Sequence, residues 1–274
     1  MKIDQKRIVI TGASSGIGRA LLQELSKRQV EIVAVARNEA RLEDAVGSVT
    51  GSRARVMAFP CDLALPREVD DLFAFALQQM GGIDLFFANA GFAYWERVVK
   101  PDWRRIEAIF KTNVYSPIYS VEKMHALFPD VDYRVVITSS ILGRVGLEGY
   151  AIYSATKAAL DRFAEVYRLE NGPRGRLTLA YPLAVRSGFL QTAGDAPTPW
   201  LSQSAESAAR GIVRGIEKDR ETIYTSWILP PMLLANHLFP FTRRWYQAID
   251  GRVSRRRWAA QRKAREPEEK AHEQ

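Results

Sequence analysis

The sequence predicts an α/β fold, with a doubly wound and mainly parallel sheet covered by helices on both faces. In the first half of the chain, short apolar runs of strand length alternate with amphipathic helical runs. Most of the apolar runs also end in glycine or small polar residues. Crossovers of this kind are right-handed, so the carboxyl ends of the strands share one edge of the sheet. We therefore expect a ligand at that edge.

Composition sets the domain organisation. With 274 residues, 47% of them apolar, the chain is long enough for one large α/β domain, which we place at 1–226. Cys61 is the only cysteine, so an internal disulfide is excluded, and a reducing, cytoplasmic location is expected. Strand-like residues begin almost at the N-terminus, unlike a signal peptide. A basic, aromatic and helical extension is expected over 227–264, followed by a disordered tail over 265–274.

The first strand, residues 7–11, leads into a glycine-rich turn and then an amphipathic helix. Glycines allow close backbone approach, and the helix N-terminus presents free N–H groups to an anion. A pyrophosphate fits this arrangement, while a tight turn without a ligand is the alternative. The candidate contacts are Gly12, Ser14, Ser15, Gly16, Ile17 and Gly18.

The second strand, residues 31–36, ends at Arg37. An NAD site has an acidic residue here that accepts a hydrogen bond from the ribose 2′-hydroxyl. A guanidinium instead binds a 2′-phosphate in forked geometry, which favours NADP(H). Arg41, one helical turn later, is placed to assist. An ordinary solvated arginine is the alternative interpretation.

The third and fourth strands, 54–59 and 83–88, also end in candidate cofactor contacts. Asp62, next to Leu63, either accepts a hydrogen bond from an adenine amino group or caps the helix that begins near Pro66. The small residues Asn89, Ala90 and Gly91 leave room for a ligand. Cys61 is interpreted as a buried filler rather than a reactive thiol.

A long helix is expected over 102–128, with Asn113 on its apolar face. A buried asparagine needs hydrogen-bond partners. Asn113 either satisfies a backbone kink near Pro117 or holds a water molecule near the site.

The stretch 135–157 carries groups for proton chemistry. An apolar strand stops at Thr138-Ser139-Ser140, a glycine-rich turn follows, and a helix then carries Tyr153 and Lys157. Residues four apart share one face of a helix. A serine, a tyrosine and a lysine can therefore meet at the ligand edge.

Taken together, these residues resemble the short-chain dehydrogenase/reductase family over about residues 5–225. The matching positions are Thr11, Gly12, Gly16, Ile17, Gly18, Asp62, Asn89, Ala90, Gly91, Asn113, Ser140, Tyr153 and Lys157. The resemblance implies a Rossmann-like, seven-stranded sheet and a nicotinamide cofactor. It also implies a homodimer or homotetramer.

The family roles carry over residue by residue. Tyr153 would be the general acid/base, and Ser140, rather than Ser139, would hold the substrate oxygen. Lys157 would bind the nicotinamide ribose and lower the pKa of the tyrosine. A cation at that spacing is worth about 2–3 pKa units against an ordinary tyrosine value of about 10. Asn113 would support a water that relays protons to Lys157.

The second half departs from the family at one point. A strand over 177–181 leads to Pro182, and Leu183 stands where the family has glycine. Leucine resists positive φ, which predicts a changed local backbone. By the resemblance, Pro182, Val185 and Ser187 would contact the nicotinamide, and 188–204 would cover the substrate. Helix 205–218 and strand 222–225 complete the sheet.

The extension leaves two interpretations open. Residues 227–241 are apolar but too short and too interrupted by proline to span a bilayer. Residues 242–263 carry eight basic side chains against one acidic one, and Trp245, Ile249 and Val253 repeat every four residues among them. Such a helix either lies on a membrane surface or packs on the body or on a second subunit.

The function predicted is an NADP(H)-dependent oxidoreductase that transfers a hydride between nicotinamide and a carbonyl or secondary alcohol. The aromatic residues Phe92, Tyr94 and Trp95 follow a strand end, where they either line the mouth of a site for an apolar small-molecule substrate or pack in the core. The alternative is a catalytically weak nucleotide-binding scaffold that uses the basic extension to bind a membrane or a partner. The sequence predicts no metal site and has no recognised nucleic-acid-binding fold.

Overall fold

The structure, a computed structural model, describes residues 1–171, 176–185, 201–239 and 250–259, and the single residues 189, 193, 194, 196, 197, 241, 244, 247 and 248. Its main sheet has seven strands in the order β3-β2-β1-β4-β5-β6-β9, and every neighbouring pair is parallel. The strands are β1 (Arg7–Thr11), β2 (Glu31–Ala36), β3 (Arg55–Pro60), β4 (Leu85–Ala88), β5 (Arg134–Thr138), β6 (Arg176–Tyr181) and β9 (Thr222–Tyr224). The predicted seven-stranded parallel sheet is confirmed, with strand bounds that differ by one or two residues.

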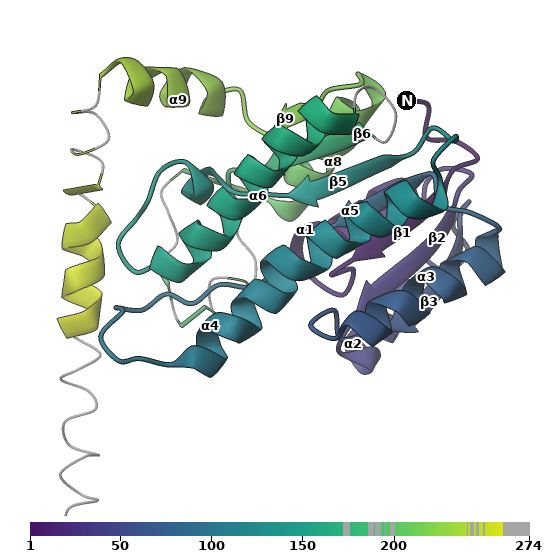
Figure 1. The fold of residues 1–274 in the computed structure, drawn as a ribbon, viewed down its shortest axis with the longest axis horizontal. Helices are drawn as coiled ribbons and strands as arrows, with labels where there is room; N and C mark the ends of the chain where they lie inside the picture. The colour runs from purple at the N-terminus through teal and green to yellow at the C-terminus, as the bar shows by residue number, and fades with distance from the viewer. Residues whose placement is uncertain are drawn as a thin grey trace, which may run out of the picture.

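Helices cover both faces of the sheet (Figure 1). They are α1 (Gly16–Leu25), α2 (Glu39–Gly47), α3 (Pro66–Met80), α4 (Trp103–Phe110), α5 (Ser116–Leu127), α6 (Ala151–Asn171) and α8 (Ala205–Glu217). Strand β1 explains the two layers, because Ile8 and Ile10 enter one apolar cluster while Val9 enters the other. The first cluster lies under α1 and α8, and the second lies under α3, α5 and α6. A strand buried on both faces needs an apolar residue at nearly every position, as β1 has.

The helix expected over 102–128 is not continuous. A π-helical turn, Lys111–Tyr115, separates α4 from α5. Its residues Asn113 and Val114 are buried. Such a turn inserts one extra residue and redirects the side chains that follow, and it is frequent at functional sites.

The strand order reverses between β1 and β4, since β2 and β3 lie on one side of β1 while β5, β6 and β9 follow β4. In open parallel sheets a ligand binds outside the carboxyl ends of the strands at such a reversal. The glycine-rich turn after β1 and the small residues after β4 both stand at this place.

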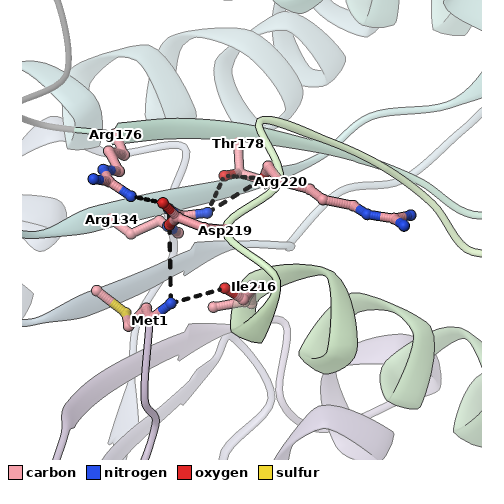
Figure 2. A network of polar contacts seen from close by, with 7 residues as sticks. All are labelled: Met1, Arg134, Arg176, Thr178, Ile216, Asp219 and Arg220. Carbon is pink, nitrogen blue, oxygen red and sulfur yellow. Dashed lines mark hydrogen bonds and ion pairs between the residues drawn. The ribbon is translucent and has the colours of Figure 1, made fainter.

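The opposite, amino-terminal edge carries a polar network (Figure 2). Arg134 begins β5, is 1% exposed, and forms an ion pair with Asp219, which also pairs with Arg176. The second guanidinium nitrogen of Arg134 donates to the Thr178 hydroxyl at 3.1 Å. The amino group of Met1 lies 3.9 Å from the Asp219 carboxylate. The network thus joins the chain start, β5, β6 and the turn before β9.

The extension lies outside the sheet layers (Figure 1). It contains α9 (Leu229–Leu238) and a helical segment over 250–259. Among the described residues, no helix combines the length and the apolar character needed to cross a membrane. Several large apolar side chains near α9 are exposed, including Trp227, Leu234 and Leu238.

Candidate active site

The glycine-rich turn after β1 packs directly on the residues that follow β4. A Cβ added to Gly18 would lie 2.1 Å from the carbonyl oxygen of Gly12 and 2.7 Å from the Asn89 amide nitrogen. Gly12 has a φ of +69°, and a Cβ there would lie 3.0 Å from Cα of Ala90. Side chains at these positions would push the turn off β4, so glycine is required for the backbone to form this compact cradle.

Threonines at the ends of the strands hold the cradle in place. The Thr11 hydroxyl accepts hydrogen bonds from the backbone N–H groups of Asn89 and Ala90, at 2.9 Å and 3.0 Å. The Asn89 side chain donates to the Thr11 carbonyl at 3.0 Å and accepts from the Thr138 hydroxyl at 3.0 Å. The carboxyl ends of β1, β4 and β5 are therefore fixed to one another. Polar residues that close apolar strand runs were the sequence signal for this contact.

Arg37 is exposed at the end of β2, and no ion pair of its guanidinium occurs in the part of the chain that the structure describes. The next residue, Asn38, caps α2 by accepting from the Arg41 N–H at 2.9 Å. The guanidinium of Arg37 is thus available to an incoming anion beside the glycine turn, where Ser14 and Ser15 precede α1.

Asp62 does not cap α3, so the helix-cap alternative is wrong. The N-cap position is Leu65, and the Asp62 carboxylate instead accepts from the Ala64 N–H at 3.0 Å. This local turn orders the residues between β3 and α3, including the buried Leu63. Cys61 is 4% exposed, and burial raises the pKa of its thiol to about 12, as expected of a filler.

Asn113 is fully buried in the π-helical turn, and its side chain holds the loop after β4. Its amide nitrogen donates to the Phe92 carbonyl at 2.8 Å, and its oxygen accepts from the Phe92 N–H at 3.0 Å. A weaker bond at 3.3 Å reaches the Thr156 hydroxyl on α6. The side chain therefore does not satisfy a kink near Pro117. The Asn113 side chain also packs close to Gly91, because a Cβ added to Gly91 would lie 3.1 Å from the Asn113 side-chain oxygen.

The two serines after β5 have different surroundings. Ser139 is 1% exposed, and its hydroxyl donates to the Asp161 carboxylate at 2.8 Å. Asp161 also binds Arg144 at 2.9 Å, which fixes the turn after the serines. Ser140 is half-buried, and its hydroxyl accepts from the Leu142 N–H at 3.2 Å. Ser139 is occupied by the scaffold, and Ser140 interacts with Tyr153.

Tyr153 and Lys157 are buried on one face of α6, with 8% and 5% of their surfaces exposed. The Lys157 ammonium lies 5.6 Å from the centre of the Tyr153 ring and donates to the Thr138 carbonyl at 2.8 Å. Burial lowers the pKa of Lys157 to about 8, against a weaker opposing effect of Asp161. The helix thus delivers a phenol and an amine to the carboxyl end of β5.

The expected lowering of the tyrosine pKa is not found in this structure. Burial raises the pKa of Tyr153 to about 12, and hydrogen bonding to Ser140 offsets only part of this. A lowered value would require the ammonium to act directly on the phenol. Here desolvation disfavours the charged forms of both groups, and Lys157 binds a backbone carbonyl instead.

The segment after β6 keeps ordinary backbone geometry. Leu183 does not adopt a positive φ, and its N–H donates to the Thr225 hydroxyl at 3.2 Å. Pro182 is half-buried, and Val185 belongs to the short strand β7 (Ala184–Val185), which pairs with β8 (Ser202–Gln203). Ser187 and much of the expected substrate-covering loop lie outside the described residues.

An apolar cluster surrounds Tyr153 and was only partly anticipated. The Phe189 and Tyr150 rings lie 5.8 Å and 6.2 Å from the Tyr153 ring. Trp95 belongs to the same cluster and is 3% exposed. The aromatic run after β4 had suggested an apolar environment, but Tyr150, Phe189 and Trp258 carried no sequence signal of their own. Among the described residues, no group of three or more histidine, cysteine, aspartate or glutamate side chains is arranged to hold a metal.

Comparison with known proteins identifies the family. The short chain dehydrogenase family model matches residues 6–197, so the chain belongs to that family. An uncharacterized oxidoreductase of Myxococcus xanthus is 30% identical over 86% of this chain and 94% of its own length. The 11-beta-hydroxysteroid dehydrogenase-like 2 protein of Arabidopsis thaliana is 30% identical over 84% of this chain and 77% of its own length. The recognition of the family from sequence is confirmed.

Two solved structures have the same fold. A short chain dehydrogenase/reductase from Burkholderia phymatum, in complex with NAD, has a TM-score of 0.77 at 22% identity and covers 86% of this chain and 94% of its own. A short-chain dehydrogenase from Sphingobium yanoikuyae, in complex with NADPH, has a TM-score of 0.74 at 23% identity and covers 88% and 94%. The chain is an oxidoreductase of a family whose members bind NAD or NADP.

Proposed function

We propose that this protein is an NADP(H)-dependent oxidoreductase that interconverts an apolar carbonyl compound and the corresponding secondary alcohol. One observation supports it above the others. A buried tyrosine–lysine pair stands at the same sheet edge as a glycine cradle able to take a pyrophosphate. The scaffold alternative is not favoured, because Asn113, Ser140, Tyr153 and Lys157 are all retained and brought to one edge.

The nicotinamide cofactor supplies the hydride when it is bound. Tyr153 then donates its phenolic proton to the carbonyl oxygen in reduction, or receives one from the alcohol in oxidation. Ser140 donates a hydrogen bond to the same substrate oxygen, and Ser139 is unsuited to this role because it binds Asp161. Lys157, whose ammonium lies 5.6 Å from the centre of the Tyr153 ring, would hold the nicotinamide ribose. A water molecule next to Asn113 completes a path for protons to Lys157.

The preference for NADP(H) rests on Arg37. Its exposed guanidinium ends β2 in a position where an acidic residue would repel a 2′-phosphate. Ala36 replaces the carboxylate that a ribose 2′-hydroxyl would need. Asp62, with its carboxylate fixed by the Ala64 N–H, is placed to accept a hydrogen bond from the adenine amino group.

The test is a substrate screen that follows NADPH absorbance, with wild type compared against Tyr153→Phe and Arg37→Ala. Tyr153→Phe should lose at least about a thousandfold in turnover, because phenylalanine has no hydroxyl proton to deliver, with NADPH affinity retained. Arg37→Ala should weaken NADPH binding about tenfold or more and leave NADH binding unchanged. Full activity in Tyr153→Phe would refute the role of Tyr153 as the proton donor. Equal affinity of the wild type for NADPH and NADH would refute the assignment to NADP(H).

We also propose that the extension 227–264 touches a membrane surface through α9. Trp227, Leu234 and Leu238 are more than half exposed, and basic residues follow them in sequence. When vesicles that contain anionic lipid are sedimented, the wild type should be found in the pellet with them. A Leu234→Ser, Leu238→Ser variant should stay in the supernatant. Equal sedimentation of the two proteins would count against this contact.

A further inference from the structure

The helical segment 250–259 is fixed against the loop that leads to Tyr153. Arg255 forms an ion pair with Glu148 at 2.8 Å, and the Gln247 side chain donates to the Gly146 carbonyl at 2.7 Å. Within the segment, Ser254 is fully buried and Gly251 is also buried. The end of the extension therefore packs on the body of the same chain.

An aromatic stack joins the two. The Trp258 ring stacks on the Trp95 ring, with centres 5.0 Å apart and planes at 24°. Gly149, with a φ of +92°, makes the space, because a Cβ there would lie 2.6 Å from Trp95 and 3.1 Å from Trp258. The Arg97 guanidinium lies 5.9 Å from the centre of the Trp258 ring. A buried ring is thus covered by a second ring from the far end of the chain.

Contacts continue from this stack to the proposed general acid. The backbone N–H of Trp95 donates to the Ala193 carbonyl at 2.6 Å, and the backbone N–H of Ala193 donates to the Phe189 carbonyl at 3.0 Å. The Phe189 ring meets the Tyr153 ring edge-on. Trp95, Ala193 and Tyr153 belong to one apolar cluster, against which Phe189 and Trp258 pack.

We propose that Trp95 forms an outer wall of the substrate site and that Trp258 is the positioning residue that holds this wall, so that the site selects bulky apolar carbonyl compounds. The inference rests on the proposed oxidoreductase function. A carbonyl oxygen that reaches the Tyr153 hydroxyl must extend its substituents among the neighbouring side chains, and those are mainly aromatic. Without the indole of Trp258, Trp95 loses the surface that covers it.

Kinetics of the full chain with NADPH and two probes, benzophenone and acetone, test the wall. Trp258→Ala should raise KM for benzophenone about tenfold or more, because a large apolar contact surface is loosened, with KM for acetone and kcat nearly unchanged. Trp258→Phe keeps an aromatic ring and should restore most of the selectivity. Arg256→Ala is the matched control, since Arg256 is exposed on the same helix. Trp258→Leu serves the same purpose if the alanine variant fails to fold.

A binding measurement separates this proposal from the proposed function. Calorimetric titration of benzophenone into the NADP-saturated protein should give a Kd about tenfold weaker in Trp258→Ala than in wild type. The Kd of NADPH should be the same in both proteins. If the wild type binds benzophenone but reduces no ketone, the proposed carbonyl reduction is refuted, whereas the proposed role of Trp95 and Trp258 is retained. Three results would overturn the proposed role of Trp95 and Trp258. They are the same Kd of benzophenone in both proteins, an equal rise in KM for benzophenone and acetone, and no binding of benzophenone by the wild type.

Discussion

Strand β5 has a buried cation at each end, and the two cations have different partners. Arg134, the first residue of the strand, pairs with the Asp219 carboxylate and donates to Thr178. Lys157 reaches the last residue, where it donates to the Thr138 carbonyl and lies over the Tyr153 ring, and no ion pair of Lys157 occurs in the described residues. Burial lowers the pKa of both groups.

The difference distinguishes a structural charge from a functional one. A buried charge with a carboxylate partner and further hydrogen bonds is compensated, and it joins segments of the fold. A buried charge without a counter-ion keeps its desolvation cost, and such groups concentrate at functional sites. Burial of the Lys157 charge therefore carries a desolvation cost, which makes this group a candidate for a functional role.

The largest effect should follow from Lys157→Met, which removes the uncompensated charge and keeps the length of the side chain. We expect kcat/KM to fall at least about a thousandfold, or roughly 4 kcal/mol of transition-state stabilisation. The free energy of unfolding at neutral pH should not fall, because the ammonium contributes a cost rather than a gain. Ketone reduction and urea unfolding of both proteins measure this. If the variant is clearly less stable than the wild type, the charge of Lys157 stabilises the fold as that of Arg134 does, and the proposed difference between them is wrong.

The pH dependence of stability should carry the same signature. The pKa of Lys157 is about 8 in the folded protein, whereas an unfolded lysine titrates near about 10.4. Below the folded value both states hold the proton, and the full cost of burial is present. As the pH rises from about 8 to about 10.4 the folded state loses its proton first, so the wild type gains up to about 3 kcal/mol relative to Lys157→Met.

The measurement is urea unfolding of the two proteins from about pH 7 to about pH 10. Tyr153 acts in the opposite direction at higher pH, because its pKa is raised to about 12 and the unfolded state ionises first. The comparison between two proteins that both contain Tyr153 cancels this contribution. A stability difference that stays constant with pH would show that Lys157 is not buried in its charged form.

The smallest effects should come from the paired end of β5. Asp219→Asn keeps a residue that tolerates the positive φ of 59° found there. It should still cost about 2 kcal/mol, less than a fully buried pair, because Asp219 is partly exposed. Arg176→Ala, which removes an exposed partner of the same carboxylate, should cost less than about 1 kcal/mol. Activity should be retained in both variants. If both variants lose the same free energy of unfolding, the stability contributed by Arg134 does not depend on the Asp219 carboxylate.

Local patterns in the sequence were sufficient for the parallel, doubly wound class of the sheet and for the polar residues at its carboxyl edge, whereas the number of strands came from the family resemblance. Strand runs that end near Gly12, Asn89 and Ser140 predicted that these residues share one edge, because the carboxyl ends of parallel strands meet there. The spacing of Tyr153 and Lys157 likewise places them on one helical face. These inferences need only the period of an element and the place where it stops.

The remaining features depend on contacts between distant segments. Nothing near Trp95 indicates that Trp258 covers it, and Asp161 reads as a solvated helix residue although it binds Ser139. The pKa of Tyr153 was misjudged because a Coulomb estimate needs the depth of burial and the direction of the lysine, which only the packed structure provides. The cap alternative for Asp62 could be excluded only from the packed structure, in which its carboxylate turns back to Ala64.

The π-helical turn at Lys111–Tyr115 has a consequence for how this site tolerates changes in chain length. Each helical residue advances the direction of its side chain by about 100°, so one residue fewer before Asn113 would rotate it by that angle relative to α5. Its amide would leave Phe92, and the backbone at Gly91 would lose its anchor. A single-residue deletion in α4 could be absorbed by converting the turn to regular helix, which would keep the fold. Register along this helix, and not only residue identity, is therefore a condition for the site.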